Sequence, residues 1–236
     1  MTHILLTGSS RGIGAATRAS LLARGANVTG HGSRPHDADT VGADLREPQS
    51  PQLLWEQALE RSGGKIDVLI NNAGLFDASP LDASDIEWLD KWEENLRINL
   101  TAAAQLSRFA VRHWQERGAA GRIVHIASRA GHRGDSPAHW HYAAAKGGML
   151  AMHKTIARAY AKDRICSFAI TPGFTDTAMA DDYLESRGGA GLLADIPLGR
   201  VAEPEEIANI AVYLALDAPE SLTGATLDAN GASYVR

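Results

Sequence analysis

The sequence predicts an α/β fold in which seven parallel strands form one doubly wound, Rossmann-type sheet. Three observations predict it. Short apolar runs alternate with longer helical segments along the whole chain, without an internal repeat or a low-complexity linker. A glycine-rich turn separates the first apolar run from the first helical segment. The length of 236 residues suits a single domain spanning 1–236 with a large core.

Seven short apolar runs are the expected strands. They span 3–7, 27–31, 40–44, 66–70, 122–128, 164–170 and 225–229. The expected helices span 12–24, 52–61, 139–162 and 203–216, with two more between 84 and 117. Strands that alternate with helices pair in parallel, and parallel sheets bind ligands at the carboxyl ends of their strands. The candidate functional residues are therefore those that follow each strand.

The overall composition argues against several classes of protein. The formal charge of −5 and the absence of a Lys/Arg block argue against a nucleic-acid surface. No apolar run approaches the length of a membrane span, and the first run is too short for a signal peptide. Cys166, the one cysteine, cannot form an internal disulfide and is expected in the core. We therefore expect a cytoplasmic protein that binds neither nucleic acid nor membrane.

The turn "TGSSRGIG" is the first motif that carries chemistry. It places Gly8, Gly12 and Gly14 between an expected strand and an expected helix. Glycine lets the backbone approach a phosphate closely, and a helix N-terminus supplies unpaired N–H groups and a positive dipole end. The spacing Gly-x-x-x-Gly-x-Gly differs from the more familiar Gly-x-Gly-x-x-Gly. Together with its position, the turn predicts a dinucleotide site.

The residues about 20 positions further along indicate which dinucleotide is bound. An acid there would hold the ribose 2′-hydroxyl of NAD. Gly32 takes that place, and Ser33 and Arg34 follow it. A hydroxyl and a cation suit a 2′-phosphate, and Arg11 in the glycine turn is a second cation. The sequence therefore favours NADP(H) as the cofactor. NAD(H) remains the alternative, because both arginines would also suit a solvated surface.

The stretch "HYAAAKGGM" places Tyr142 and Lys146 four residues apart, with only alanine between them. Alanine is the best helix former, and residues i and i+4 share a helix face, so the phenol and the ammonium would lie side by side. Such a pair also arises by chance on surface helices. The surrounding motifs decide between these two interpretations.

Those motifs make the chain resemble the short-chain dehydrogenase/reductase family over nearly its whole length. They follow one another in the family's order: "TGSSRGIG", "NNAG" at 71–74, Asn99 in "RINL", Ser128 after the fifth expected strand, Tyr142 with Lys146, and "TPGFTDT" at 171–177. The segments "PLGRVAEPEEIA" and "LTGATLDANGA" are similar to the family's C-terminal portion. One departure is the short segment before "GADL", where relatives carry a further helix.

The resemblance implies a set of catalytic and cofactor-binding residues. The implied catalytic residues are Asn99, Ser128, Tyr142 and Lys146. The expected cofactor contacts are Gly8, Ser10, Arg11, Gly12, Ile13, Gly14, Ser33, Arg34, Asp44, Leu45, Asn72, Ala73, Gly74, Tyr142, Lys146, Pro172, Gly173, Thr175 and Thr177. Asp44 matches a family residue near the adenine ring. The alternative interpretation is that Asp44 is a solvated carboxylate at the end of a strand.

These residues suit the interconversion of a ketone and a secondary alcohol. Free tyrosine has a pKa near 10 and is a poor base at neutral pH. The Lys146 ammonium is expected to lower the pKa of Tyr142 by ~1–3 units, which suits general acid–base catalysis. Ser128 is expected to donate a hydrogen bond to the carbonyl oxygen. The resemblance implies that Lys146 binds the nicotinamide ribose and that Asn99 holds a water linking Lys146 to solvent.

The sequence favours a carbonyl reductase that acts on a small molecule. The C-terminal half is most similar to 3-oxoacyl-acyl-carrier-protein reductases, which are the alternative. An acyl-carrier partner favours basic residues at the mouth of the site, whereas 178–194 is acidic at its start. A catalytically inactive nucleotide sensor would lack Tyr142 or Lys146, and both are present. Enoyl reductases of this fold use a longer tyrosine-to-lysine spacing, so a carbonyl is the expected target.

Further expectations concern metals and aromatic residues. No metal is expected, because no carboxylate or thiolate is spaced with the histidines as metal ligands require. His139, Trp140 and His141 are expected to line the substrate mouth or to pack on a neighbouring loop. Trp88 and Trp92, four apart on a helix, are expected in the core or at a subunit contact.

Two last expectations concern motion and assembly. The segment 176–196, with a helical piece at 180–186 followed by Gly188, Gly189 and Gly191, is expected to be a lid. Family members pair through two long helices and the C-terminal strand, so a homodimer or homotetramer is expected.

Overall fold

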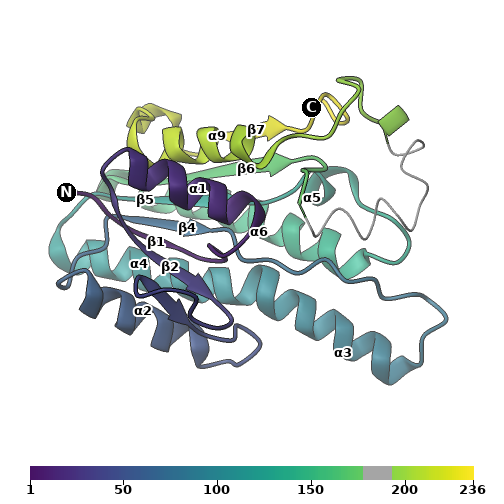
Figure 1. The fold of residues 1–236 in the computed structure, drawn as a ribbon, viewed down its shortest axis with the longest axis horizontal. Helices are drawn as coiled ribbons and strands as arrows, with labels where there is room; N and C mark the ends of the chain where they lie inside the picture. Colours follow the sequence, from purple (N-terminus) through teal and green to yellow (C-terminus); the bar gives the residue numbers. More distant parts are fainter. Residues whose placement is uncertain (178–192) are drawn as a thin grey trace.

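In the computed structural model, which describes residues 1–177 and 193–236, seven strands form one parallel sheet (Figure 1). The strands are β1 (His3–Leu6), β2 (Asn27–Gly32), β3 (Thr40–Gly42), β4 (Val68–Asn71), β5 (Gly121–Ile126), β6 (Ile165–Pro172) and β7 (Thr226–Ala229). Their order is β3-β2-β1-β4-β5-β6-β7, so the expected doubly wound sheet is confirmed. The order reverses between β1 and β4, and ligands bind at such a reversal point.

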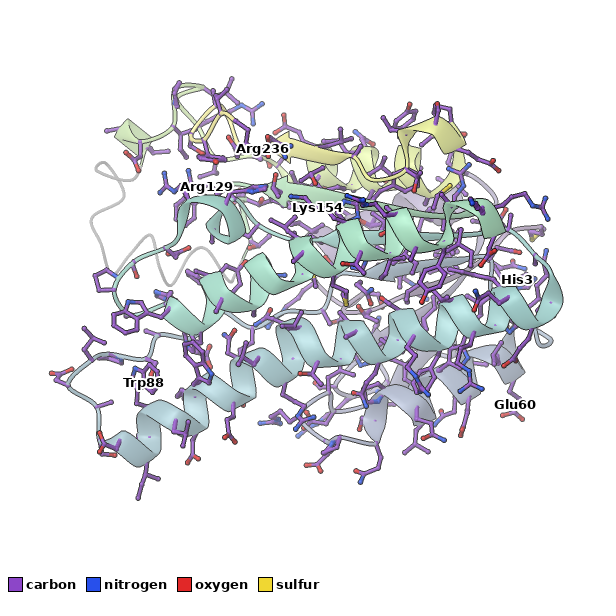
Figure 2. All side chains as sticks on the ribbon, turned by 180° about the vertical axis from the view of Figure 1, so that it is seen from behind. His3, Glu60, Trp88, Arg129, Lys154 and Arg236 are labelled. Carbon is purple, nitrogen blue, oxygen red and sulfur yellow. The ribbon has the colours of Figure 1, made fainter. Side chains whose placement is uncertain are left out.

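Helices cover both faces of the sheet, as a parallel sheet requires. Those on one face, in front of the sheet in Figure 1, are α1 (Gly12–Ala23) and α9 (Pro204–Leu216). Those on the other face include α2 (Ser50–Arg61), α4 (Ala102–Arg117) and α6 (Trp140–Tyr160), and Figure 2 shows α4 and α6 side by side there. Alternate strand residues supply two cores: Ile4 and Leu6 pack toward α1 and α9, and Leu5 packs toward α2 and α4. Cys166 belongs to the first core, as expected.

The two helices expected between 84 and 117 are joined without a loop, through a π-helical turn. α3 (Asp85–Leu96) begins with a capping box of Ser84 and Glu87 and extends beyond the sheet in Figure 1. The turn η1 (Arg97–Thr101) then leads into α4. A π turn widens a helix locally and frequently marks a functional site. This one contains Asn99, which is 0 % exposed.

Other differences from the expected elements lie at strand ends and in short helices. β5 ends two residues before Ser128, and β6 extends to Pro172. The short elements α5 (Ala130–Arg133), η2 (Ala161–Asp163) and η3 (Glu220–Leu222) are additional. Helices of three or four residues are too short to leave a periodic pattern in the sequence. Residues 33–39 contain no helix, in agreement with the short spacing before "GADL". Within the described residues, no helix is long and apolar enough to cross a membrane.

A layer of polar side chains crosses the core beneath the carboxyl ends of β4, β5 and β6. Asn71 Nδ2 lies 3.3 Å from His125 Nδ1, and His153 Nδ1 lies 2.9 Å from Ser167 Oγ. The two imidazole rings lie 6.0 Å apart between centroids, and both residues are 0 % exposed. Burial lowers the pKa of His125 to about 3 and that of His153 to about 4. Both imidazoles are therefore neutral at pH 7.

This polar layer predicts that the fold loses stability in mild acid. The folded pKa values of His125 and His153 lie below the unfolded value near 6.5, so the unfolded chain binds protons first as the pH falls. The two neutral histidines make their full contribution to the free energy of unfolding well above pH 6.5. The free energy of unfolding then decreases by about 1.4 kcal/mol per pH unit for each histidine between pH 6 and 4. Urea unfolding at pH 7.5, 6 and 5 measures this decrease, which His125→Asn should reduce. Equal unfolding free energies at the three pH values would contradict it.

Candidate active site

A cavity of ≈ 600 Å³ lies at the carboxyl ends of β1, β4, β5 and β6. Of the residues predicted from the sequence, those that line it are Gly8, Ser10, Arg11, Gly12, Ile13, Gly14, Ser33, Asp44, Leu45, Asn72, Ala73, Gly74, Asn99, Ser128, Tyr142, Lys146, Pro172, Gly173, Thr175 and Thr177. Arg34 is the exception, because it is exposed and lies outside the lining. Lining residues that the sequence did not single out include His31, Arg46, Phe76, Arg129, Asp135 and Phe174.

The glycine turn after β1 packs backbone to backbone against the end of β4. Gly8 has φ +65°, and a Cβ there would lie 2.8 Å from Ala73 Cα. A Cβ on Gly14 would lie 1.9 Å from the Gly8 carbonyl oxygen. Asn72 Nδ2 donates to the carbonyls of Thr7 and Gly8 at 3.0 and 2.9 Å, and Thr7 Oγ1 accepts the N–H groups of Asn72 and Ala73 at 2.9 and 3.0 Å. Only glycine fits at positions 8 and 14.

The start of α1 presents a surface suited to an anion. The first four N–H groups of a helix have no partner within the helix, and its N-terminus carries a partial positive charge. α1 begins at Gly12, directly after the exposed Arg11. The loop after β6 reaches this point, since a Cβ on Gly12 would lie 2.8 Å from Thr177 Cγ2. Phosphate groups are the ligands that this combination favours.

The ends of β2 and β3 form the cavity wall next to the glycine turn. His31 is 3 % exposed and contacts both the glycine turn and the residue after β3. Asp44 forms an ion pair with Arg46, with an N···O distance of 2.6 Å, and Arg46 lies 3.7 Å from Glu94. Hydrogen bonds from Arg46 hold the pKa of Asp44 below its usual value. Asp44 is thus a paired carboxylate on the cavity wall.

Ser128, Tyr142 and Lys146 meet at the other end of the cavity. Ser128 follows β5 and Tyr142 lies in the first turn of α6, so the end of a strand meets the start of a helix. Lys146 Nζ donates to the Ile126 carbonyl at 2.9 Å and lies 5.7 Å from the centroid of the Tyr142 ring. Burial of Lys146, which is 3 % exposed, lowers its pKa to about 8.

The expected decrease in the pKa of Tyr142 is wrong. Loss of solvation raises the pKa of Tyr142 to about 12. A hydrogen bond with Ser128 acts in the opposite direction, and the nearby charge of Asp135 raises the pKa further. Desolvation of the phenol outweighs the positive charge of Lys146, and the degree of burial cannot be read from the spacing of the two residues. Tyr142 is therefore fully protonated at neutral pH.

Asn99 occupies the π turn and is held by four hydrogen bonds. Its Oδ1 accepts the Leu75 N–H at 3.1 Å, and its Nδ2 donates to the Leu75 carbonyl at 2.9 Å. Asn95, which the sequence did not single out, receives two further bonds from this Nδ2, at 2.8 Å to Oδ1 and 3.2 Å to its carbonyl. A Cβ on Gly74 would lie 2.9 Å from Asn99 Oδ1 and 3.8 Å from Lys146 Nζ. The amide side chain thus fixes the loop after β4 beside Lys146.

Aromatic side chains surround the Tyr142 end of the cavity. The Phe76 ring stacks on His139 at 4.1 Å and meets Tyr142 edge-on at 4.7 Å, between centroids. Arg129 Cζ lies 4.7 Å from the centroid of Phe174. Figure 2 shows Arg129 and Trp88 toward the same end of the molecule.

His139 packs on the loop after β4 through Phe76, which agrees with the second form of the expectation, whereas Trp140 packs on α3; neither residue belongs to the cavity lining. Trp88 stacks on Trp92 at 5.3 Å and meets the exposed Trp140 edge-on at 6.4 Å. The described residues contain no group of three or more His, Cys, Asp or Glu side chains that could hold a metal ion.

Comparison with known proteins agrees with this geometry. A family model described as enoyl-(acyl carrier protein) reductase matches residues 8–231. The 3-oxoacyl-[acyl-carrier-protein] reductase FabG of Escherichia coli K12 is 35% identical over 98% of this chain and 96% of its own length. Nodulation protein G of Rhizobium sp. strain N33 is 34% identical over 96% of this chain and 94% of its own length.

A solved structure, that of a short-chain type dehydrogenase/reductase from Mycobacterium marinum, superposes with a TM-score of 0.89 at 25% identity. The superposition covers 100% of this chain and 96% of that one. The chain belongs to the short-chain dehydrogenase/reductase family. Its members are oxidoreductases that use a nicotinamide cofactor.

The close packing at Gly14 predicts the effect of one methyl group. Gly14→Ala places a Cβ against the Gly8 carbonyl, so the turn must shift and the affinity for a nicotinamide dinucleotide should decrease by about tenfold or more. Fluorescence titration with NADPH measures this affinity. Gly118→Ala is the matched control, because Gly118 ends α4 with φ +57° in open space away from the cavity. Normal affinity in the Gly14 variant would contradict the assignment.

Proposed function

We propose that this protein is an NADP(H)-dependent reductase that converts a ketone into a secondary alcohol. The observation that carries the proposal is one cavity with a phosphate-binding turn at one end and Ser128, Tyr142 and Lys146 together at the other. A cofactor that spans these two ends would bring its nicotinamide beside the tyrosine. When bound, the nicotinamide supplies the hydride, and the protein supplies position, hydrogen bonds and the proton.

Tyr142 is proposed to donate the proton to the carbonyl oxygen. Its raised pKa keeps the phenol protonated at neutral pH, which suits the acid role needed for reduction. Ser128 is proposed to donate a hydrogen bond to the same oxygen and to stabilise the negative charge that develops on it. Phe76 contacts the edge of the Tyr142 ring and fixes its orientation. The phenol is therefore available as the acid that reduction requires.

Lys146 and Asn99 are proposed to position the tyrosine and the ribose. With a pKa of about 8, Lys146 is mostly charged at pH 7 and able to donate to ribose hydroxyls while it keeps its bond to Ile126. Asn99 holds the backbone of Leu75 beside Lys146. The water that the family resemblance assigns to Asn99 stays a prediction.

The choice of NADP(H) over NAD(H) is proposed from the charges at the β2 end of the cavity. Ser33 follows β2 and lines the cavity, and the carboxylate that lines it after β3, Asp44, is paired with Arg46. Arg11 lines the same cavity and is the proposed cation for a 2′-phosphate. Arg34, which the sequence favoured for this role, lies outside the lining, so we assign the role to Arg11 and Ser33.

A small-molecule ketone is the proposed substrate class. Asp135 is an exposed carboxylate on the cavity lining near Tyr142. The adjacent α3 carries Asp85, Glu87, Asp90, Glu93 and Glu94 with one lysine, Lys91. An acidic acyl-carrier partner would meet repulsion from these groups.

A 3-oxoacyl-acyl-carrier-protein reductase is the second candidate, because curated relatives with 34–35% identity bear that name. Comparing kcat/KM for a 3-oxoacyl group on the carrier protein and on N-acetylcysteamine separates the two candidates. A preference of more than about tenfold for the carrier would favour the second.

Three further expectations remain predictions. The homodimer or homotetramer and the cytoplasmic location rest on the family resemblance and on the sequence. The lid expected over 176–196 falls mainly on 178–192, which lie outside the described residues.

Removal of one hydroxyl group tests the proposed chemistry. Tyr142→Phe removes the proton donor and keeps the ring, so ketone reduction should slow by about 10²-fold or more while NADPH affinity stays within a few-fold. Absorbance at 340 nm with a ketone panel and NADPH measures the rate. The control is Tyr213→Phe on α9, where the tyrosine is 43% exposed and outside the cavity. Near-normal turnover in the Tyr142 variant would refute the assignment.

A further inference from the structure

His31 is a cavity residue that neither the glycine motif nor the catalytic motif includes. It lies in β2, one residue before the end of the strand, and is 3 % exposed. Its Nδ1 accepts the Gly8 N–H at 3.2 Å, and its Nε2 lies 2.8 Å from the Ala43 carbonyl, directly after β3. One imidazole thus connects two segments that are 35 residues apart in the sequence and lie on either side of β2.

The two partners fix the protonation of the ring. A backbone N–H can only donate, so Nδ1 is the acceptor; a carbonyl can only accept, so Nε2 carries the hydrogen. Burial lowers the pKa of His31, in agreement with this neutral form. The nearby Asp44 carboxylate acts in the opposite direction and is itself paired with Arg46. The imidazole therefore acts as a neutral cross-link with one acceptor and one donor.

The backbone of His31 strengthens the same connection. Its carbonyl accepts the Ser9 N–H at 2.8 Å, and its N–H donates to Ser9 Oγ at 3.0 Å. A Cβ on Gly30 would lie 2.4 Å from Ser9 Oγ, so the contact between β2 and the turn has no free space. The side-chain bond to Gly8 therefore acts on a turn that the backbone already holds close.

These two segments carry different parts of the proposed cofactor site. Gly8 belongs to the turn that precedes the phosphate-binding start of α1. Ala43 precedes Asp44 and Leu45, which line the cavity where the family resemblance puts the adenine ring. A ligand that contacts both segments needs them at a fixed separation, and His31 spans that separation. Preorganisation of this kind increases affinity, because the two segments lose less conformational freedom on binding.

We propose that His31 is a positioning residue that sets the affinity for the adenosine half of the dinucleotide, by holding the phosphate turn and the adenine wall together. The inference rests on the proposed function, because it presumes a nicotinamide dinucleotide in this cavity. His31 does not take part in hydride or proton transfer. Its effect therefore belongs to cofactor binding, whereas the interaction with the ketone should be unaffected.

The test compares two buried histidines that each make two hydrogen bonds. His31→Leu removes both bonds at the cavity. His153→Leu removes two comparable bonds, to Ser167 and Gly224, at a site outside the cavity lining. His31→Asn is the conservative variant, since its Oδ1 takes the place of Nδ1 and accepts the Gly8 N–H. The measurements are Kd values for NADPH and for adenosine 2′,5′-bisphosphate, which lacks the nicotinamide, together with thermal unfolding of each variant.

The expected result is a loss of about tenfold in affinity for both ligands in His31→Leu, with at least partial recovery in His31→Asn. His153→Leu should unfold at lower temperature and bind both ligands with wild-type affinity. The KM for NADPH should rise in His31→Leu while the KM for the ketone changes less than about twofold. If His31→Leu does not fold, the same comparison is made with His31→Gln, which keeps a donor toward Ala43 and loses the Gly8 acceptor.

Two results would overturn the inference alone. One is wild-type affinity for both ligands in His31→Leu, or in His31→Gln where that variant replaces it. The other is an equal loss of affinity in His153→Leu, which would mean that general destabilisation explains the effect. A wild-type protein that binds neither NADPH nor NADH would instead refute the proposed function, and the inference with it.

Discussion

The contact between the turn after β1 and the end of β4 is the constraint on which the rest of the site depends. Gly8 and Ala73 approach so closely that no side chain fits between them, and the Asn72 amide binds two carbonyls of the turn. This contact sets where α1 begins and therefore where its free N–H groups point. It also sets where the loop of Gly74 and Leu75 leaves the sheet, and that loop bonds to Asn99. Both ends of the cavity are thus positioned from one junction.

The sheet order explains why such a junction exists in this fold. β1 pairs with β2 on one side and β4 on the other, so the chain leaves β1 and β4 toward opposite faces. β5 and β6 then extend the same edge toward Ser128 and Pro172. A ligand along this edge meets backbone N–H groups first and polar side chains afterwards. In the proposed function, phosphate binding and hydride transfer take place at opposite ends of the cavity, which suits a large cofactor that reacts at one end.

Burial controls the protonation of Lys146 and Tyr142, whereas hydrogen bonds from Arg46 control that of Asp44. Lys146 and Tyr142 are both driven toward their neutral forms, which gives a protonated phenol and an ammonium whose pKa lies near physiological pH. A bound cofactor changes the local charge and solvation, so the two groups are poised to respond to it. The nearby histidine layer, His125 and His153, follows the same rule and stays neutral.

Sequence reasoning identified the elements whose signals are local. The glycine turn, the Tyr142/Lys146 spacing and the strand-to-helix alternation depend on residues close together in the chain, and they predicted the sheet and most of the cavity lining. The π turn at Asn99 was not predicted, because a single wider turn within a helix has no distinct sequence pattern.

The sequence did not predict His31 and Arg46 as site residues either, because the segments around them become neighbours only when β2 and β3 pair. The pKa of Tyr142 was misjudged for a related reason: the sequence gives a charged neighbour but not the degree of burial. Arg34 stays a predicted cofactor contact, and it is exposed and lies outside the cavity lining.

One cavity is proposed to bind a nicotinamide dinucleotide and to recognise its 2′-phosphate through Arg11. Titration of wild-type protein with NADPH and NADH by calorimetry, repeated with Arg11→Ser and Arg34→Ser, tests it most directly. We expect NADPH to bind about tenfold more tightly than NADH, a difference that Arg11→Ser should remove and Arg34→Ser should preserve. Binding of neither nucleotide, or equal affinity of the wild type for both, would contradict the claim.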